Sequence, residues 1–145
     1  MSKPILFLNG PNLNMLGVRE PDIYGATTLA EIKKISENQA EKHGLKIEFR
    51  QSNFEGELVG WIQEAVEKFD GIIINPAAYT HTSVAILDAL KMVKGPVIEL
   101  HISNPHTRES FRHTSYVSLA ATGTIAGFGI AGYRLAVDAM AELLR

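Results

Sequence analysis

Short runs of apolar residues alternate along the chain with longer amphipathic stretches. Residues 5–8 and 71–75 are continuous apolar runs that end at asparagine followed by Gly or Pro. Runs of this kind predict strands buried on both faces of a sheet. Residues 46–50 alternate between apolar and polar side chains, which predicts an edge or half-covered strand. Residues 96–101 and 124–128 predict the fourth and fifth strands.

Apolar residues recur at helical spacing between these strands. The first such stretch begins at Thr28, a residue type that caps helices, and stops at Gly44. The same spacing predicts helices within residues 58–69, 82–93 and 133–144. Strands that alternate with helices predict a parallel sheet with helices on both faces. Five strands in a chain of 145 residues fit an α/β fold of the flavodoxin-like, doubly wound type.

Composition narrows the classes of function. The length of 145 residues fits one domain, residues 1–145, and the net charge of -2 provides no basic field for nucleic acid. The chain has no cysteine, which excludes disulfides, thiolate metal sites and a cysteine nucleophile. The first apolar run is too short for a signal peptide or a membrane span. We therefore expect a cytoplasmic, single-domain protein with no membrane or nucleic-acid partner.

The predicted sheet indicates where a ligand site should lie. In open parallel sheets, ligands bind beyond the carboxyl ends of the strands. Polar residues 103–115, predicted as a loop or short turns, belong to one of these ends. The segments that follow predicted strands are residues 9–24, 51–57, 75–82 and 99–112.

The first of these segments carries Arg19 and Tyr24 on a loop of about fifteen residues, which is long for a strand-to-helix connection. Long loops at this edge are often lids. A tyrosine with its ordinary pKa of about 10 is a poor base, but a nearby guanidinium favours the phenolate. Arg19 and Tyr24 are therefore candidates for a base that forms when the lid closes. The alternative is that Tyr24 anchors the loop.

Glu99 and His101 end the fourth predicted strand, where residues two apart share a face. A carboxylate orients a neighbouring imidazole and raises its pKa, which suits a general acid. The alternative is a structural His–Glu pair. The position of both residues at the carboxyl end of a strand favours the functional interpretation.

Asn75 and His81 follow the third predicted strand and offer defined donors and acceptors to hydroxyls or carboxylates. Hydroxyl residues within 80–83 also suit the cap of the next helix, and the two roles are compatible. Arg108 and Arg112 are four apart and would share a face if that segment were helical. Such a pair suits a carboxylate or polyol, although two arginines in a polar loop are more often solvated.

Several cofactor and nucleophile motifs are missing. The sequence has no GxxxxGK phosphate loop, no GxGxxG after the first strand and no GxSxG elbow. The five histidines form no convincing metal set, and no lysine has the pattern of a buried Schiff-base residue. We therefore expect no metal and no cofactor.

The strand-end motifs extend in order over nearly the whole chain. They are Asn9-Gly10-Pro11-Asn12-Leu13-Asn14 with Arg19 and Tyr24-Gly25, Gln51-Ser52-Asn53 with Glu55-Gly56-Glu57-Leu58, and residues 75–83, 99–104, 108–112 and 115–133. With these motifs the chain resembles the type II 3-dehydroquinate dehydratases (3-dehydroquinases). The resemblance implies dehydration of 3-dehydroquinate to 3-dehydroshikimate, without metal or Schiff base. It implies a flavodoxin-like subunit that packs as trimers into a homododecamer.

The resemblance also implies a catalytic role for each of five residues. Tyr24, made basic by Arg19, would remove a proton from the carbon next to the ketone. A water near Asn12 would hold the resulting enolate. His101, oriented by Glu99, would protonate the departing hydroxyl. An elimination through an enolate needs a separate base and acid, each tuned toward the working pH.

Further residues would bind the substrate. The resemblance implies that Asn75 and the backbone of Ile102 and Ser103 bind the substrate carboxylate. His81 and Arg112 would hold ring hydroxyls, and Arg108 would support the positive charge of the loop. Asp88 from a neighbouring subunit would complete the site. A biosynthetic role in the shikimate pathway, for aromatic amino acids, and a catabolic role on quinate both remain open. So do a non-catalytic flavodoxin-like binding domain and a different enzyme, such as a hydrolase, on the same scaffold.

Overall fold

The computed structural model describes residues 2–18, 20, 22 and 25–145. Its centre is a parallel sheet. The strands are β1 (Ile5–Asn9), β2 (Ile47–Gln51), β3 (Gly71–Asn75), β4 (Val97–His101) and β5 (Gly123–Ala126). They lie in the order β2-β1-β3-β4-β5, and each neighbouring pair is parallel. All five predicted strands are therefore confirmed, with the alternating strand β2 at an edge.

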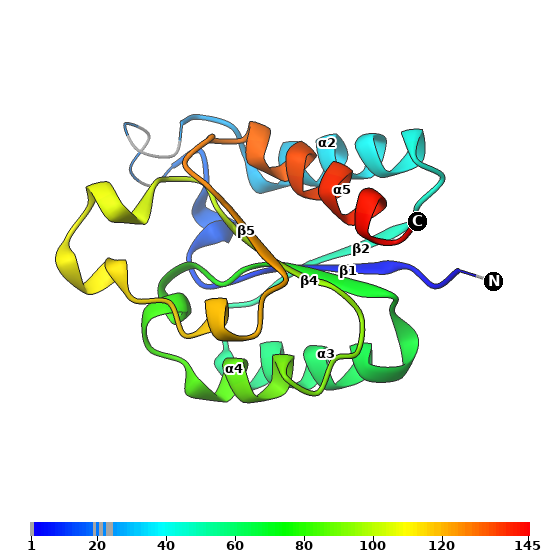
Figure 1. Ribbon diagram of the computed structural model, residues 1–145. Coiled ribbons are helices and arrows are strands. Elements are labelled where there is room, and N and C mark those ends of the chain that lie inside the picture. The colour runs from blue at the N-terminus through cyan, green and yellow to red at the C-terminus, as the bar shows by residue number, and fades with distance from the viewer. Residues whose placement is uncertain (1, 19, 21, 23–24) are drawn as a thin grey trace.

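Helices cover both faces of this sheet (Figure 1). The α-helices whose bounds lie within the described residues are α2 (Leu29–Lys42), α3 (Glu55–Lys68), α4 (Val84–Leu90) and α5 (Ala131–Leu143). Helices α2 and α5 lie on one face, and α3 and α4 lie on the other. The predicted α/β, flavodoxin-like fold is confirmed. Within the described residues, no helix combines the length and the apolar character that crossing a membrane requires.

Alternation along the buried strands builds two apolar layers. Successive side chains of a strand point to opposite faces. Phe7 and Ile73 accordingly pack in the layer beneath α2 and α5, together with Tyr133 of α5. Leu6 and Ile72 pack in the layer against α3 and α4. Strands β1, β3 and β4 are buried along their whole length, which explains why β1 and β3 are apolar on both faces up to their terminal asparagines.

Side-chain caps mark the start of α2 and α4, and α4 differs most from its predicted range. Thr28 caps α2 as predicted, since its side chain accepts a hydrogen bond from the Glu31 N–H. Helix α4 covers only part of the predicted range 82–93, because Ser83 caps it at the Ile86 N–H and it ends at Leu90. A separate 3₁₀ helix, Ala77–His81, precedes it. The polar segment 103–115 contains two 3₁₀ turns, as predicted.

Candidate active site

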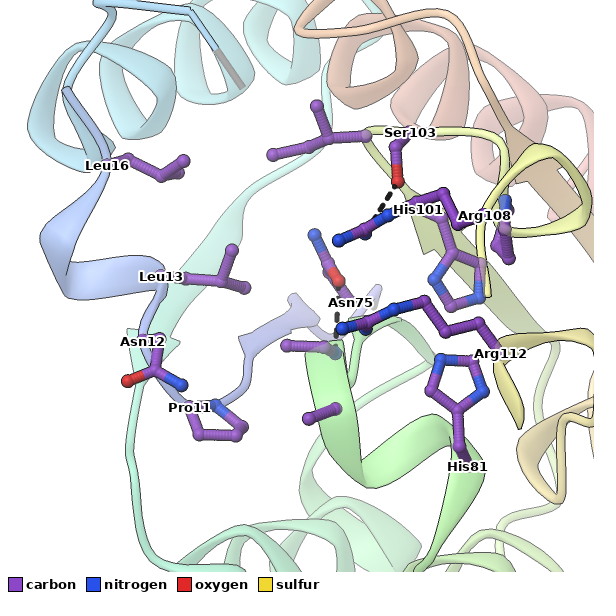
Figure 2. A pocket seen from close by; sticks show the side chains of 14 residues that line it. Pro11, Asn12, Leu13, Leu16, Asn75, His81, His101, Ser103, Arg108 and Arg112 are labelled. Atoms are coloured by element: carbon purple, nitrogen blue, oxygen red, sulfur yellow. Dashed lines mark hydrogen bonds between the residues drawn. The ribbon is translucent and has the colours of Figure 1, made fainter. Parts of the chain in front are cut away.

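A cavity opens at the carboxyl edge of the sheet, where β1, β3 and β4 end (Figure 2). Its volume is about 80 Å³. Because one water needs roughly 10–15 Å³, the cavity has room for a small polar molecule. The polar residues of the wall are Asn12, Asn75, His81, His101, Ser103, Arg108 and Arg112. Figure 2 shows Asn12 on one side, the histidines and arginines on the other, and Asn75 between them.

Most of the predicted site residues that the structure describes line this cavity, including the backbone segment of Ile102 and Ser103. Glu99 lies behind His101 rather than in the wall. Asp88 is exposed on α4 and is not part of the wall of its own chain's cavity. Arg19 and Tyr24 lie outside the described residues, so their roles remain predictions.

Glu99 and His101 form a buried pair. The His101 Nε2 atom lies 2.5 Å from Glu99 Oε2, and the two residues are only 8% and 1% exposed. Because a carboxylate accepts hydrogen bonds, Nε2 carries the proton in this contact. The ring orientation is therefore set by Glu99, and Nδ1 is the nitrogen left for proton transfer. A histidine held in this way has the geometry of a general acid.

Three hydroxyl groups share the carboxylate of Glu99 with His101. Ser115 Oγ and Ser118 Oγ donate at 2.7 and 2.5 Å, and Thr124 Oγ1 donates at 3.4 Å. Burial by itself would raise the pKa of Glu99. The hydrogen bonds from His101, Ser118 and Ser115, together with the charge of His101, outweigh burial and hold the pKa of Glu99 below its usual value. Glu99 is therefore ionised at neutral pH.

His81 presents a neutral ring to the same cavity. Its Nδ1–H donates to the carbonyl oxygen of Thr114 at 2.8 Å, because a carbonyl can only accept. Burial lowers the pKa of His81, and the nearby charges of His101 and Arg112 act in the same direction, against the opposing hydrogen bond to Thr114. The neutral ring keeps Nε2 as an acceptor, which suits a ligand hydroxyl.

Two guanidinium groups give the wall positive charge. Arg108 Nη1 donates to Ser103 Oγ at 3.2 Å, and Arg112 Nε donates to Glu109 Oε1 at 3.1 Å. The two arginines do not share a helix, because Arg108 lies between the two 3₁₀ turns. Both nevertheless point toward Asn75 (Figure 2). This part of the wall therefore favours an anionic ligand.

Loop contacts hold Asn12, which has a left-handed backbone with a φ of 69°. Its N–H donates to Asn53 Oδ1 at 2.9 Å, and Gln51 Nε2 donates to the same oxygen at 3.1 Å. The hydroxyl of Tyr79 donates to the carbonyl oxygen of Asn53 at 2.7 Å. Asn53 therefore ties together the segments that follow β1, β2 and β3.

Sequence reasoning did not assign roles to Asn53, Ser115 or Ser118. The available signal was their location, because each is a polar residue in one of the quoted motifs at the carboxyl edge. Nothing in the local pattern indicates which partner such a residue contacts. Among the described residues, no cluster of three or more His, Cys, Asp and Glu residues could hold a metal ion.

Comparison with known proteins identifies the family. The family model described as Dehydroquinase class II matches residues 3–141. The chain belongs to this family. A family member from Phenylobacterium zucineum, a 3-dehydroquinate dehydratase, is 61% identical over 145 residues, which is 100% of both chains. A 3-dehydroquinate dehydratase from Streptomyces avermitilis is 60% identical over 141 residues, which cover 97% of this chain and 89% of the relative.

The fold is also that of solved class II dehydroquinases. The crystal structure of the type II dehydroquinase from Propionibacterium acnes superposes with a TM-score of 0.94 and 48% identity, and covers 98% of each chain. A 3-dehydroquinate dehydratase-like protein from Bifidobacterium longum gives a TM-score of 0.73 at 38% identity, over 99% of this chain and 98% of the other. The family predicted from the motifs is therefore confirmed.

Proposed function

We propose that this chain dehydrates 3-dehydroquinate to 3-dehydroshikimate through an enolate, as a catalytic domain that comprises residues 1–145. The observation that carries the proposal is the buried Glu99–His101 pair beside a cavity lined by Arg108 and Arg112. An oriented acid next to a site for an anion provides two of the parts that loss of water from a hydroxylated carboxylic acid requires, and the base is the third. Family membership and the names of the relatives support the choice of substrate.

The reaction starts with removal of a proton from the carbon next to the ketone. Tyr24 is the base, and the guanidinium of Arg19 favours its phenolate. The electron pair of the broken C–H bond moves to the ketone oxygen and forms an enolate, which a water near Asn12 stabilises. The enolate then collapses, the C–O bond to the hydroxyl breaks, and His101 protonates the departing oxygen to release water. Neither a metal nor a Schiff base takes part in these steps.

Substrate binding divides between two sets of groups. Asn75 and the backbone of Ile102 and Ser103 bind the carboxylate, beside the positive charge of Arg108. His81 and Arg112 hold ring hydroxyls. The neutral ring of His81 supports this division, because its Nδ1–H is used by Thr114 and its Nε2 is free to accept from a hydroxyl.

The active assembly in this proposal is a homododecamer built from trimers, in which Asp88 completes the site of a neighbouring subunit. Asp88 is exposed on α4 and does not line its own cavity, which agrees with a role outside its own chain. Large apolar side chains on the surface also support an assembly. Phe54, Leu119 and Phe128 are 73%, 71% and 64% exposed.

Ultraviolet absorbance tests the reaction directly, because the product is a conjugated enone. Purified protein mixed with 3-dehydroquinate should give a rise in absorbance. The Tyr24→Phe variant should lose about 10²–10⁴-fold in kcat with little change in KM, because the base acts in the transition state. A purified wild-type protein that gives no rise in absorbance would contradict the proposed function. A Tyr24→Phe variant with a near-native rate would contradict the role of Tyr24.

The separate roles of base and acid allow a second test. In His101→Ala, dehydration should fail while the enolate still forms. Substrate recovered from D₂O should then contain deuterium at the carbon next to the ketone, although no enone appears. A His101→Ala variant that neither dehydrates nor exchanges would contradict this division of roles.

A further inference from the structure

A chain of buried hydrogen bonds lies beneath Asn75. Asn9 ends β1, Asn75 ends β3, and Tyr133 lies on α5, and their exposed fractions are 0%, 3% and 0%. The Tyr133 hydroxyl donates to Asn9 Oδ1 at 2.7 Å and accepts from Asn75 Nδ2 at 3.1 Å. Three elements far apart in sequence therefore meet in one polar contact inside the apolar layer.

The groups at the two ends of this series of hydrogen bonds determine which atom donates and which accepts in each bond. At one end, Asn9 Nδ2 donates to the carbonyl oxygen of Arg50 at 3.2 Å, and a carbonyl can only accept. At the other end, the N–H of Ala77 donates to Asn75 Oδ1 at 3.2 Å, and an N–H can only donate. The amide oxygen of Asn9 must then face Tyr133, and the amide nitrogen of Asn75 must face it as well.

The packing contacts of Tyr133 come from its ring, whereas its hydroxyl makes the hydrogen bonds to the two asparagines. Its ring stacks on Phe7 at 5.3 Å between centroids and lies 6.2 Å from Phe49, contacts that a phenylalanine would make equally well. Burial raises the pKa of Tyr133, so the hydroxyl stays protonated and remains a donor to Asn9. A buried hydroxyl is costly unless it is hydrogen-bonded, and the two asparagines provide those bonds.

We propose that Tyr133 is a positioning residue that, together with the N–H of Ala77, holds Asn75 so that its second amide N–H is presented to the cavity. Asn75 Nδ2 has two hydrogens, of which one is used by Tyr133, while Oδ1 is used by Ala77. Ala77 has a left-handed backbone with a φ of 52°, so the turn that supplies its N–H is itself a specialised conformation. The ligand group at Asn75 must therefore be a hydrogen-bond acceptor, such as a carboxylate oxygen. The choice of 3-dehydroquinate as the ligand rests on the proposed function, whereas the orientation of the amide does not.

Tyr133→Phe removes the hydroxyl and keeps the ring. We expect KM for 3-dehydroquinate to rise about 3- to 10-fold, which corresponds to the loss of one typical hydrogen bond, with kcat changed less than about twofold. The affinity for 3-dehydroshikimate, measured by calorimetry, should fall by the same factor.

The matched control is Ser36→Ala, which also deletes a fully buried hydroxyl, one that donates to the Ile32 carbonyl oxygen at 2.8 Å within α2. This control should lower thermal stability and leave KM unchanged.

A double-mutant cycle separates positioning from a purely structural role. If Tyr133 acts through Asn75, Tyr133→Phe should raise KM in the wild-type background and have no further effect on KM in Asn75→Ala. An unchanged KM in Tyr133→Phe, or an equal rise in both backgrounds, would overturn the proposal. If Tyr133→Phe does not fold, Asn9→Ala is the second variant, because it removes the acceptor of the Tyr133 hydroxyl. Its effect on KM should likewise disappear in the Asn75→Ala background.

Crystal structures distinguish failure of this inference from failure of the proposed function. Absence of enone formation by the wild-type protein would contradict the function alone. The amide of Asn75 should still have a single orientation in the wild-type crystal, and a rotated or second orientation in the Tyr133→Phe crystal. An Asn75 amide that keeps its single orientation in the variant would overturn the positioning role, whatever the substrate.

Discussion

Four hydrogen bonds converge on the carboxylate of Glu99, one from His101 and three from hydroxyl groups. Burial raises the pKa of Glu99, but the bonds from His101, Ser118 and Ser115 and the charge of His101 hold it below its usual value. A carboxyl group with a depressed pKa contributes stability above its unfolded pKa, and this contribution is lost as the pH falls through the folded pKa. Ser118 and Ser115 thus add to the effect of His101 and help to keep Glu99 ionised as the pH falls.

The variant with both Ser115→Ala and Ser118→Ala should have a higher Glu99 pKa, because two donors to the charged form are gone. When the pH is lowered from 8, the double variant should therefore lose folding stability and kcat at a higher pH than the wild type does. Thermal unfolding and kcat measured across this range check both shifts. Thr124→Ala is the matched control and should shift less, because its hydroxyl is 3.4 Å from the carboxylate. Identical pH profiles in wild type and double variant would contradict the role of the serines.

The ends of β1 and β3 approach so closely that only glycine fits at position 10. The N–H of Gly10 donates to the carbonyl oxygen of Asn75 at 2.8 Å. A β-carbon on residue 10 would lie 2.4 Å from the carbonyl oxygen of Pro76, closer than real contacts allow. The obstacle is backbone rather than a flexible side chain, so the two segments would have to separate. These segments carry Asn12 and Asn75 into the cavity.

Gly10→Ala should therefore destabilise the fold by about 1–3 kcal/mol, as overpacking typically does, and should also raise KM. Urea unfolding and steady-state kinetics measure the two effects. Gly60→Ala is the control, because Gly60 lies inside α3 and, apart from its chain neighbours and the backbone of its own helix, nothing described lies within 4 Å of the added carbon. That variant should gain about 0.5–1 kcal/mol. A Gly10→Ala variant as stable as the wild type would contradict the importance of the close approach.

Most elements could be predicted from the sequence because apolar periodicity is a local property. The strands β1 and β3 and the capped start of α2 at Thr28 are examples. The short α4 was predicted too long, since the hydroxyl pattern of residues 80–83 suggested a cap without indicating which residue provides it.

Several contacts of the site had no local signal in the sequence. Asn53 meets Asn12 across 41 residues, and Tyr133 meets Asn9 across 124 residues. Such pairs depend on how elements pack, which no nearby pattern of residues encodes.

The whole molecule places almost every polar group of the site at one edge of its sheet and leaves Asp88 on an outer helix surface. In the proposed trimers, the Asp88 of one subunit reaches the cavity of another. Each active site is then composed of two chains. This arrangement makes the proposed assembly testable by its function as well as by its size.

Light scattering should give a particle of about twelve times the 15.9 kDa of the chain. Inactive His101→Ala and inactive Asp88→Ala proteins, unfolded together and refolded, should recover part of the wild-type activity. Some mixed sites then combine an intact His101 with an intact Asp88. Each variant refolded alone is the control and should stay inactive. Mixtures without recovered activity would contradict a shared site.

The contact of Tyr133 with Asn9 and Asn75 also has a consequence for how the chain folds while the ribosome synthesises it. The ribosome releases Asn9 and Asn75 well before Tyr133, and the partners at the two ends of the contact are 124 residues apart. Before α5 docks, the Ala77 N–H can already hold Asn75 Oδ1, but Asn75 Nδ2 lacks the Tyr133 hydroxyl. A nascent chain can therefore form β1 and β3 before the hydrogen bonds around Asn75 are complete. In the proposed role of Tyr133, the docking of the last helix adds the final contribution to ligand affinity.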